Sequence, residues 1–492
     1  MAGVSLVLFF TVCHRLLETP FWSYNGSRLM SSFALAHGLN YYVLMPPGGP
    51  LFSTQYGPIA AIAYLPATLF PSPNSAVLAG SAITVLLCFS AVAFLHFAQC
   101  AGGRSYVDAL AFLTAGLLMC YLEPLKYSCF NIHADGPGLA FGAVACGALY
   151  CGGGKWRAAL PVSAVCAVLS VFSKQMFAPV PLALLLYLPV ARGRAAAVRY
   201  FLWLAAAGGL AAAASMIAVG PQRLYHCTIW MPGHASWVGT SRVVGFITAG
   251  RLFIRQSMPV PVLLLACAIY LWASGRPRSE DLRALAANRC VPLLLVGIVL
   301  LPLSFAGRAK TGGDINSLSF ALFFLTCGLT VMLADIARAQ SVSTRRLAIS
   351  VLVATILPLA ISEAPLVLDI PAKIRELPQT GQEAARAYLS RHPGEAYFPW
   401  FPLSHYYGEH QFRHYMWGIA DRLLAGEPVS QADFRAYIPP DPRVIAFASD
   451  GTPELYGFDV MKYLPEYRCP VNEPELSGWL VYGKCGARAS VQ

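Results

Sequence analysis

Residues 317–337 read SLSFALFFLTCGLTVMLADIA, and Asp335 is the only charged residue among them. A helix of this length rises about 30 Å, which matches the thickness of the hydrocarbon core of a bilayer. The stretch therefore predicts a helix that crosses a membrane.

Apolar runs of the same kind recur through the first three quarters of the chain. They are residues 3–17, 76–99, 106–122, 137–152, 157–173, 175–191, 199–219, 259–274, 291–306 and 347–368. The composition agrees with this pattern, because 57% of the 492 residues are hydrophobic and only 12% are charged, which differs strongly from soluble domains. We therefore expect an all-α polytopic membrane protein with about eleven transmembrane helices.

The basic residues between these runs predict how the chain is oriented. They fall in alternate loops, which the positive-inside rule makes cytoplasmic. These residues are Arg104, Lys155, Arg157, Arg192, Arg194, Arg199, Arg276, Arg278, Arg283, Arg289, Arg338, Arg345 and Arg346. The N-terminus then lies inside and the C-terminus outside, provided that the proline-containing residues 57–70 form a re-entrant or interfacial segment. Because these loops hold much of the basic excess behind the net charge of +11, that charge does not indicate a nucleic-acid partner.

The first apolar run gives no evidence on orientation, because no Lys or Arg precedes it. A cleaved signal sequence is the alternative interpretation of residues 1–17, but a basic n-region and a clear cleavage site are missing. With the run counted as a span, the first outside loop covers residues 18–56.

The apolar runs stop at residue 369, which predicts two regions. Residues 1–368 form the polytopic membrane region, and residues 369–492 are long enough for a small extracytoplasmic domain with its own core. Strand-like residues 443–448 and 478–482 and a helix-like segment 380–390 predict an α+β domain. The chain has 14 cysteines, and Cys469 and Cys485 are the two in this tail, where an oxidising compartment permits a disulfide.

Four segments of the predicted outside loops carry polar motifs in a definite order. The first loop contains a helix-like stretch 27–37, followed by Gly38-Leu39-Asn40-Tyr41-Tyr42 and then by Tyr56-Gly57-Pro58. The later loops contain Asn131-Ile132-His133-Ala134-Asp135-Gly136-Pro137, Lys174-Gln175 and Arg308-Ala309-Lys310-Thr311-Gly312-Gly313-Asp314-Ile315-Asn316.

This order resembles the GT-C superfamily of membrane glycosyltransferases, such as the protein O-mannosyltransferases and the aminoarabinose transferases. In that family the first loop runs from an acidic residue through a surface helix to G-x-x-x-Y and Y-x-P, and later loops carry an acid and a K-Q pair. The resemblance implies a GT-C-like fold that transfers a sugar from a polyprenyl-phosphate carrier, within membrane lipid, to a lipid, glycan or protein acceptor. It also implies an integral membrane location with the active face outside, for which we expect a bacterial inner membrane.

One departure from the family pattern concerns the acid before the surface helix. The matching stretch here is Tyr24-Asn25-Gly26-Ser27, which has no carboxylate, and Glu18 is the only carboxylate before Asp108. Three explanations stay open: Glu18 is the base, Asp135 or another loop supplies it, or the chain has lost catalysis.

The chemistry of the transfer assigns roles to the loop residues. A carboxylate must accept the proton of the attacking hydroxyl, and cations must hold the departing phosphate. The catalytic candidates are Glu18 and Asp135. The substrate-binding candidates are His133, Lys174, Gln175, Arg308, Lys310, Asp314, Asn316, Tyr41, Tyr42 and Tyr56. The competing structural roles are a helix-start acid for Asp135, a lysine at a span end for Lys174, and pairing with Asp314 for Arg308 and Lys310.

Three further hypotheses remain. No cluster with metal-ligand spacing occurs, yet a divalent cofactor stays open because some GT-C enzymes use one. A transporter or flippase of lipid-linked substrates is disfavoured, because the charges gather at span ends and no repeat is visible. A non-catalytic GT-C-like protein stays open because of the missing acid.

The aromatic and histidine residues at 397–414 either help to select an acceptor or form the core of the C-terminal domain.

Overall fold

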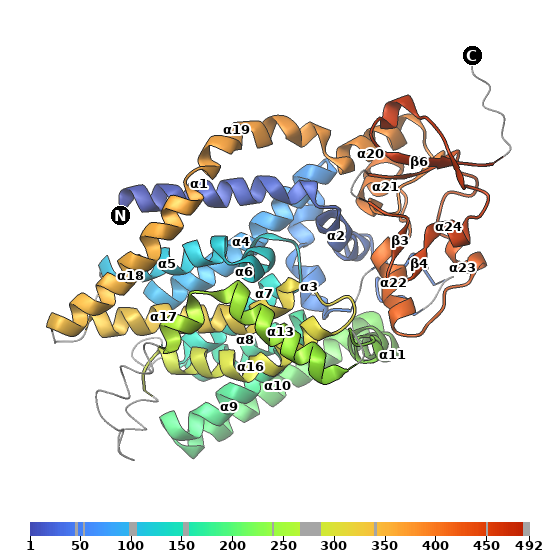
Figure 1. Cartoon of the computed structure of the whole chain (residues 1–492). Helices are drawn as coiled ribbons and strands as arrows, with labels where there is room; N and C mark the ends of the chain where they lie inside the picture. Colours follow the sequence, from blue (N-terminus) through green and yellow to red (C-terminus); the bar gives the residue numbers. More distant parts are fainter. Residues whose placement is uncertain are drawn as a thin grey trace.

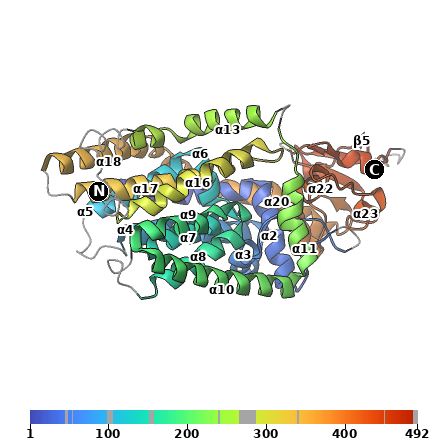
Figure 2. The same cartoon turned by 90° about the horizontal axis from the view of Figure 1, so that it is seen from below.

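The structure is a computed structural model that describes residues 1–44, 48–52, 55–97, 106–150, 157–238, 241–265, 287–338, 342–448 and 451–485. Figures 1 and 2 show a bundle of long helices with a smaller mixed region, the C-terminal domain, at one end of it.

The helical region begins with a long helix and a set of short ones before the first central helices. In order these are α1 (Ala2–Glu18), η1 (Thr19–Phe21), α2 (Ser23–Ala36), α3 (Pro58–Ala63), η2 (Leu65–Leu69), α4 (Pro73–Phe97), α5 (Tyr106–Tyr121), α6 (Glu123–Phe130), α7 (Asp135–Ala148), α8 (Ala159–Ser173) and η4 (Gln175–Phe177). It continues with α9 (Pro179–Arg192), α10 (Arg194–Val219), α11 (Pro221–Tyr225), η5 (His226–Trp230), α12 (Met231–His234), α13 (Arg242–Ser257), α16 (Cys290–Ala309), η6 (Ile315–Leu318), α17 (Ser319–Ala337), α18 (Val342–Glu363) and α19 (Leu366–Glu376).

The chain is a multi-pass membrane protein. Among the described residues, seven helical segments are long and apolar enough to cross a membrane: Ala2–Phe21, Pro73–Phe97, Gln175–Arg192, Arg194–Val219, Cys290–Ala309, Ile315–Ala337 and Val342–Glu363. Helices α5 and α6 meet at 94° and make an eighth if they form one broken span. The expectation of about eleven spans exceeds this count, because α7 and α8 have only 14 and 15 residues. The expected span at 259–274 lies mostly outside the described residues.

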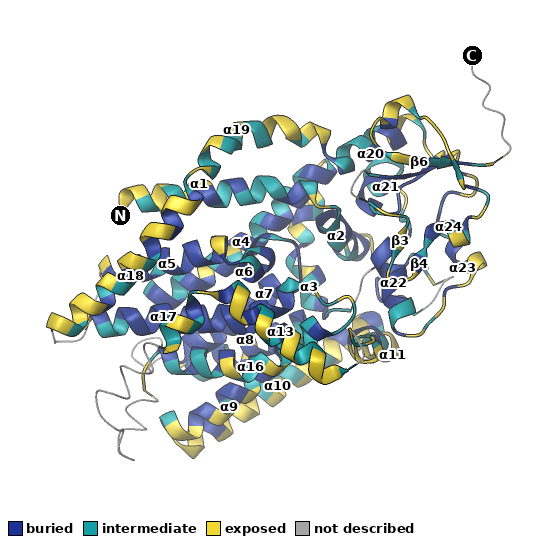
Figure 3. Ribbon diagram, in the orientation of Figure 1, coloured by how far each residue is buried: buried dark blue, intermediate teal, exposed yellow. Residues whose placement is uncertain are grey.

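The opening stretch around α17 lies at the centre of the bundle. In an apolar 18-residue stretch of the Ile315–Ala337 segment 89% of the residues are buried within the protein, compared with 11% in the corresponding stretch of α10. Figure 3 shows this contrast as a buried α17 and a largely exposed α10. Apolar side chains on α10, such as Leu210 and Ile217, are 74% and 86% exposed. Two equally apolar helices thus have different surroundings, protein for α17 and, by inference, lipid for α10.

The segment 57–70 forms two short helices, α3 and η2, with 6 and 5 residues. Neither is long enough to cross a bilayer, which agrees with the non-crossing segment predicted from its prolines. Gly57 fixes the start of this segment against α8, because its N–H donates to the Ser173 carbonyl at 3.1 Å. A Cβ at this position would lie 1.9 Å from the Phe172 carbonyl oxygen, so only glycine fits this approach.

The C-terminal domain has an α+β fold, as predicted. Its remaining elements are η7 (Leu377–Gln379), α20 (Gly381–Arg391), β1 (Ala396–Tyr397), α21 (Pro402–Glu409), α22 (Met416–Leu424), α23 (Gln431–Arg435), β2 (Val444–Phe447), β3 (Glu454–Leu455), β4 (Phe458–Asp459), α24 (Val460–Tyr463), β5 (Cys469–Pro470), η8 (Pro474–Leu476) and β6 (Leu480–Gly483). One sheet has the order β1-β2-β6-β5, with β1 parallel to β2 and the other pairs antiparallel, and β3 pairs with β4 in a second sheet. The predicted boundary at residue 369 falls inside α19.

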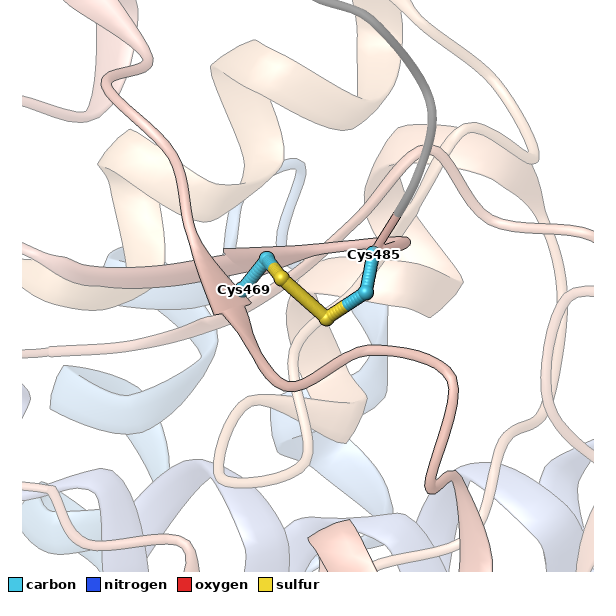
Figure 4. The surroundings of a disulfide bond; sticks show 2 residues. All are labelled: Cys469 and Cys485. Carbon is cyan, nitrogen blue, oxygen red and sulfur yellow. A yellow bond between two sulfur atoms is a disulfide. The ribbon is translucent and has the colours of Figure 1, made fainter.

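The predicted disulfide is present between Cys469 and Cys485 (Figure 4). It joins β5 to the residues just after β6, and these two strands pair antiparallel. The bond therefore closes the edge of the four-stranded sheet.

Candidate functional site

A cavity of about 550 Å³ lies where the loops of the helix bundle meet α22 of the C-terminal domain. Its polar lining includes Arg28, Gln55, Tyr56, Tyr127, His133, Lys174, Gln175, Lys310, Asp314, Asn316 and Asp421. Its apolar lining includes Met176, Ile229, Leu303, Ala306 and Phe320. Most motifs predicted to share one side of the membrane therefore converge on one cavity, which we call the loop cavity.

Asp135 lies directly beneath the loop cavity, as the first residue of α7. It is fully buried, and its Oδ1 accepts a bond from Lys174 Nζ at 2.7 Å. Its Oδ2 lies 2.9 Å from His133 Nδ1 and accepts bonds from Asn316 Nδ2 at 2.7 Å and Ser128 Oγ at 3.1 Å. Burial by itself raises the pKa of this carboxyl, but His133 and Lys174 reverse the effect and lower it. Both oxygens of the ionised Asp135 are thus occupied by donors.

His133 connects Asp135 to the wall of the loop cavity. Its Nδ1 faces the Asp135 carboxylate, and its Nε2 lies 3.1 Å from the hydroxyl of Tyr56. Nδ1 also lies 3.3 Å from the backbone N–H of Asp135, but the carboxylate is closer and accepts hydrogen bonds only, so we place the proton on Nδ1, and Nε2 accepts from the Tyr56 O–H. Burial lowers the pKa of His133 to about 3, although Asp135 acts in the opposite direction. The imidazole is therefore neutral.

Lys174 follows the last residue of α8 and reaches both Asp135 and the loop cavity. Its Nζ lies 5.1 Å from the centre of the Tyr56 ring and 4.6 Å from that of Phe320. The side chain is 7% exposed, so the lysine is a buried, paired cation and not one that extends to the membrane interface.

Arg28 is a cavity residue that the motif analysis did not identify. It lies on α2, and its guanidinium carbon is 5.0 Å from the centre of the Tyr56 ring. Its Nε and Nη1 are buried and have no hydrogen-bond partner among the described residues. One signal was present in the sequence: Arg28 is the only Asp, Glu, Lys or Arg between Glu18 and Arg104.

Only some of the candidate residues in the loop at 308–316 line the loop cavity. Asn316 and Asp314 line it, and Asp314 Oδ1 also accepts from the backbone N–H of Ile315 at 2.6 Å. Lys310 lines it too, but its Nζ donates to the carbonyls of Pro232 and Gly233 at 2.6 and 3.2 Å. Arg308 is not among the lining residues and donates from Nη1 to the Gly313 carbonyl at 3.1 Å. Neither cation pairs with Asp314 in these bonds.

Glu18 lies in a different pocket, of about 210 Å³, which is lined also by Arg15, Trp22 and Lys126. Its Oε2 accepts a bond from Arg15 Nη1 at 3.1 Å. Tyr127 lines both this pocket and the loop cavity and lies between them. The expected convergence of Glu18 and Asp135 at one cavity is therefore not what the structure shows.

The remaining substrate-binding candidates differ in position. Tyr56 and Gln175 line the loop cavity, and Gln175 Nε2 donates to the Gln55 carbonyl at 3.0 Å. Tyr41 and Tyr42 are 4% and 0% exposed and stack on each other, with ring centres 4.5 Å apart. The structure places these two in a core cluster beside the loop cavity instead of on its wall.

Asn25 lies in the first-loop stretch Tyr24–Ser27, and its amide is fully engaged. Its Nδ2 donates to the Thr19 carbonyl at 2.8 Å and to Asn131 Oδ1 at 2.9 Å, and its Oδ1 accepts from the Ile132 N–H at 2.9 Å. A carboxylate could make the third bond but not the two donations. The first and second loops are thus joined by an amide that does not line the loop cavity.

The C-terminal domain reaches the loop cavity through α22, from which Trp417, Asp421 and Leu424 line it. The aromatic and histidine residues expected at 397–414 lie elsewhere. Tyr397, His405 and His414 are fully buried, as in the alternative interpretation of them as domain core.

The described residues contain no group of three or more His, Cys, Asp or Glu side chains that could hold a metal ion.

The fold over the whole chain is similar to that of solved ArnT structures, which bears out the resemblance at the level of the fold. The particular likeness is to ArnT from Cupriavidus metallidurans. Its structure bound to undecaprenyl phosphate aligns with a TM-score of 0.56 at 12% identity, over 100% of this chain and 99% of that one. Its apo structure gives a TM-score of 0.54 at 13% identity over 100% of both chains.

Archaeal AglB from Archaeoglobus fulgidus, in complex with an inhibitory peptide and a dolichol-phosphate, aligns with a TM-score of 0.48 at 11% identity, over 100% of this chain and 74% of that one. No protein-family model matches the sequence, and a search of curated proteins finds no match.

Proposed function

We propose that this protein is an integral membrane glycosyltransferase that transfers a sugar from a polyprenyl-phosphate donor to an extracytoplasmic acceptor. The ArnT structure with undecaprenyl phosphate has the same fold, and the loop cavity has the two properties that such a donor requires. It offers cations to a phosphate and an apolar wall to a prenyl chain.

The observation that carries the proposal is the pair of cations around Tyr56. Arg28 and Lys174 each lie about 5 Å from the centre of the same ring and line the same cavity. Lys174 has a carboxylate partner, whereas the buried Nε and Nη1 of Arg28 have no partner among the described residues. Unsatisfied buried donors on a guanidinium are costly unless an anion accepts from them. A lipid-linked phosphate supplies that anion, and it is the group that departs during transfer.

The prenyl chain has a matching surface. Met176, Leu303, Ala306 and Phe320 line the cavity next to Lys174, and Leu303 and Ala306 lie on the candidate span α16. A lipid could therefore bring its phosphate to the loop ends while its chain stays against apolar helices.

The first experiment measures binding of undecaprenyl phosphate to the purified protein in detergent. Arg28→Ala and Lys174→Met should each weaken binding at least tenfold, because a charge-assisted bond to phosphate contributes about 1.5–3 kcal/mol. Arg199→Ala is the matched control, since Arg199 is exposed at the start of α10. Equal affinity in all three variants would contradict a phosphate site at Tyr56.

A second candidate function, a non-catalytic lipid-phosphate binder, is favoured by Asn25. The stretch Tyr24–Ser27, which matches the acid-bearing stretch of the family, has no carboxylate, and the three hydrogen bonds of the Asn25 amide are all structural. Incubation with a panel of radiolabelled polyprenyl-phosphate sugars separates the two functions. Release or transfer of labelled sugar supports the transferase, whereas tight lipid binding without turnover of any donor supports the binder.

A further inference from the structure

Two carboxylates, Asp314 and Asp421, line the loop cavity, whereas the catalytic candidates Glu18 and Asp135 do not. Glu18 lies in the separate pocket beyond Tyr127. Asp135 is buried with both oxygens occupied by donors and does not line the loop cavity. Asp314 lines it, but one of its oxygens accepts from the Ile315 N–H at the start of η6.

His133 and Tyr56 together offer a different proton acceptor in the loop cavity. His133 lines the cavity, and its Nε2 meets the hydroxyl of Tyr56, which lines it as well. The chain Tyr56–His133–Asp135 is continuous, with heavy-atom distances of 3.1 and 2.9 Å. A nucleophile's base that is oriented by a buried carboxylate is a recurrent catalytic arrangement.

We propose that His133 accepts the proton of the acceptor hydroxyl through the phenol of Tyr56, with Asp135 as the positioning residue that fixes the imidazole. This inference rests on the transferase function proposed above. It deepens that function by replacing the missing first-loop carboxylate with a histidine and tyrosine relay.

The side chains around His133 and Tyr56 favour proton transfer from the phenol to the imidazole. Asp135 holds the proton of His133 on Nδ1, which leaves Nε2 as the acceptor. Arg28 and Lys174 lie about 5 Å from the Tyr56 ring, where they stabilise negative charge that develops on its oxygen. Two other titratable groups face His133: the ring of Tyr127 lies 6.3 Å from the imidazole, and the hydroxyl of Tyr64 donates to the His133 carbonyl at 2.8 Å. Since burial lowers the pKa of His133, the imidazole is unprotonated before the reaction.

The sugar transfer conserves atoms and electrons. The oxygen of the acceptor hydroxyl forms a bond to the anomeric carbon of the sugar, and the bond from that carbon to the phosphate oxygen breaks. The electron pair of the broken bond leaves with the polyprenyl phosphate, held by Arg28 and Lys174. The hydroxyl proton passes to the Tyr56 oxygen while the Tyr56 proton passes to His133 Nε2. The imidazolium formed is paired with Asp135 and later releases its proton to solvent.

The test compares three variants with wild type in two assays, undecaprenyl phosphate binding and sugar release or transfer from the radiolabelled donor panel. Tyr56→Phe removes only the hydroxyl and keeps the ring, and His133→Gln removes the base. The control is His234→Gln, because His234 is exposed and does not line the loop cavity. We expect kcat to fall about 100-fold or more in His133→Gln and Tyr56→Phe, within the range of general base catalysis. Lipid affinity should stay within about threefold, which also shows that the variants fold.

The pH profile distinguishes a proton relay from a structural role. Wild-type kcat should fall in acid as His133 protonates, and the residual rate of His133→Gln should not show this acid limb. A kcat within threefold of wild type in Tyr56→Phe would overturn the relay, and the same result in His133→Gln would overturn the base. Either outcome leaves the transferase function standing, because wild type still turns over. If wild type releases no sugar from any donor, the proposed function and this inference fail together.

Discussion

The buried ion pair between Asp135 and Lys174 makes a quantitative prediction about stability. Asp135 is fully buried and Lys174 is 7% exposed, with 2.7 Å between their charged atoms. Asp135→Asn keeps the size of the side chain but leaves the lysine charge without a carboxylate. Removing one partner of a buried pair typically costs about 3–5 kcal/mol, and we expect this range for Asp135→Asn.

The opposite single change should cost less. In Lys174→Met the Asp135 carboxylate keeps His133, Asn316 and Ser128 as donors, so we expect a loss of about 2–3 kcal/mol. The double variant Asp135→Asn/Lys174→Met removes both charges. Because a buried pair replaced as a unit costs little, it should lie within about 1–2 kcal/mol of wild type.

The measurement is the unfolding free energy of the four proteins in the same detergent without lipid, arranged as a double-mutant cycle. The expected signature is a strong favourable coupling, with the double variant more stable than Asp135→Asn alone. Additive effects of the two changes, or a Lys174→Met variant less stable than Asp135→Asn, would refute the reasoning.

Three other predictions follow from single features. Gly57→Ala should destabilise the protein by about 1–3 kcal/mol or more and impair lipid binding, because the new Cβ would lie 1.9 Å from the Phe172 carbonyl oxygen. Gly209→Ala is the control, because a Cβ at Gly209 would have no atom within 4 Å. Equal melting temperatures of the two variants would contradict the close approach at Gly57. Cys469→Ser should lower the stability of the C-terminal domain by about 3 kcal/mol, since the disulfide closes a short loop. Mass spectrometry of the unreduced wild-type protein that found a free thiol at Cys469 would reject the disulfide itself. Glu409 has a pKa of about 2, below its ordinary 4.5, because donors such as His405 and Arg413 outweigh the effect of burial. The ionised Glu409 should therefore add about 3 kcal/mol to the free energy of unfolding above pH 4.5, and this stabilisation should be lost as the pH falls toward 2. A Glu409→Gln variant whose stability depends on pH in the same way as that of wild type would contradict this.

Local features of the sequence predicted several of the helices, two of the strands and the disulfide. The apolar run at 317–337 became α17, the strand-like residues 443–448 became β2, and Cys469 pairs with Cys485. These predictions succeed because the length of an apolar run and the alternation of side chains are properties of neighbouring residues. The shared position of the outside motifs also followed from the sequence, since the alternation of basic loops restricts which loop ends can meet.

Only the tertiary structure decided which side chains meet. Asp135 contacts Lys174 across 39 positions of sequence, and no periodicity predicts which of two carboxylates reaches a given lysine. The packing of α1 and α6 places Glu18 in a separate pocket, while α2 turns Arg28 toward Tyr56. The buried surroundings of α17 and the exposed apolar surface of α10 are likewise invisible in two equally apolar sequences. Hydrophobicity determines that a helix leaves water, but the angles and positions at which helices pack determine what each one faces.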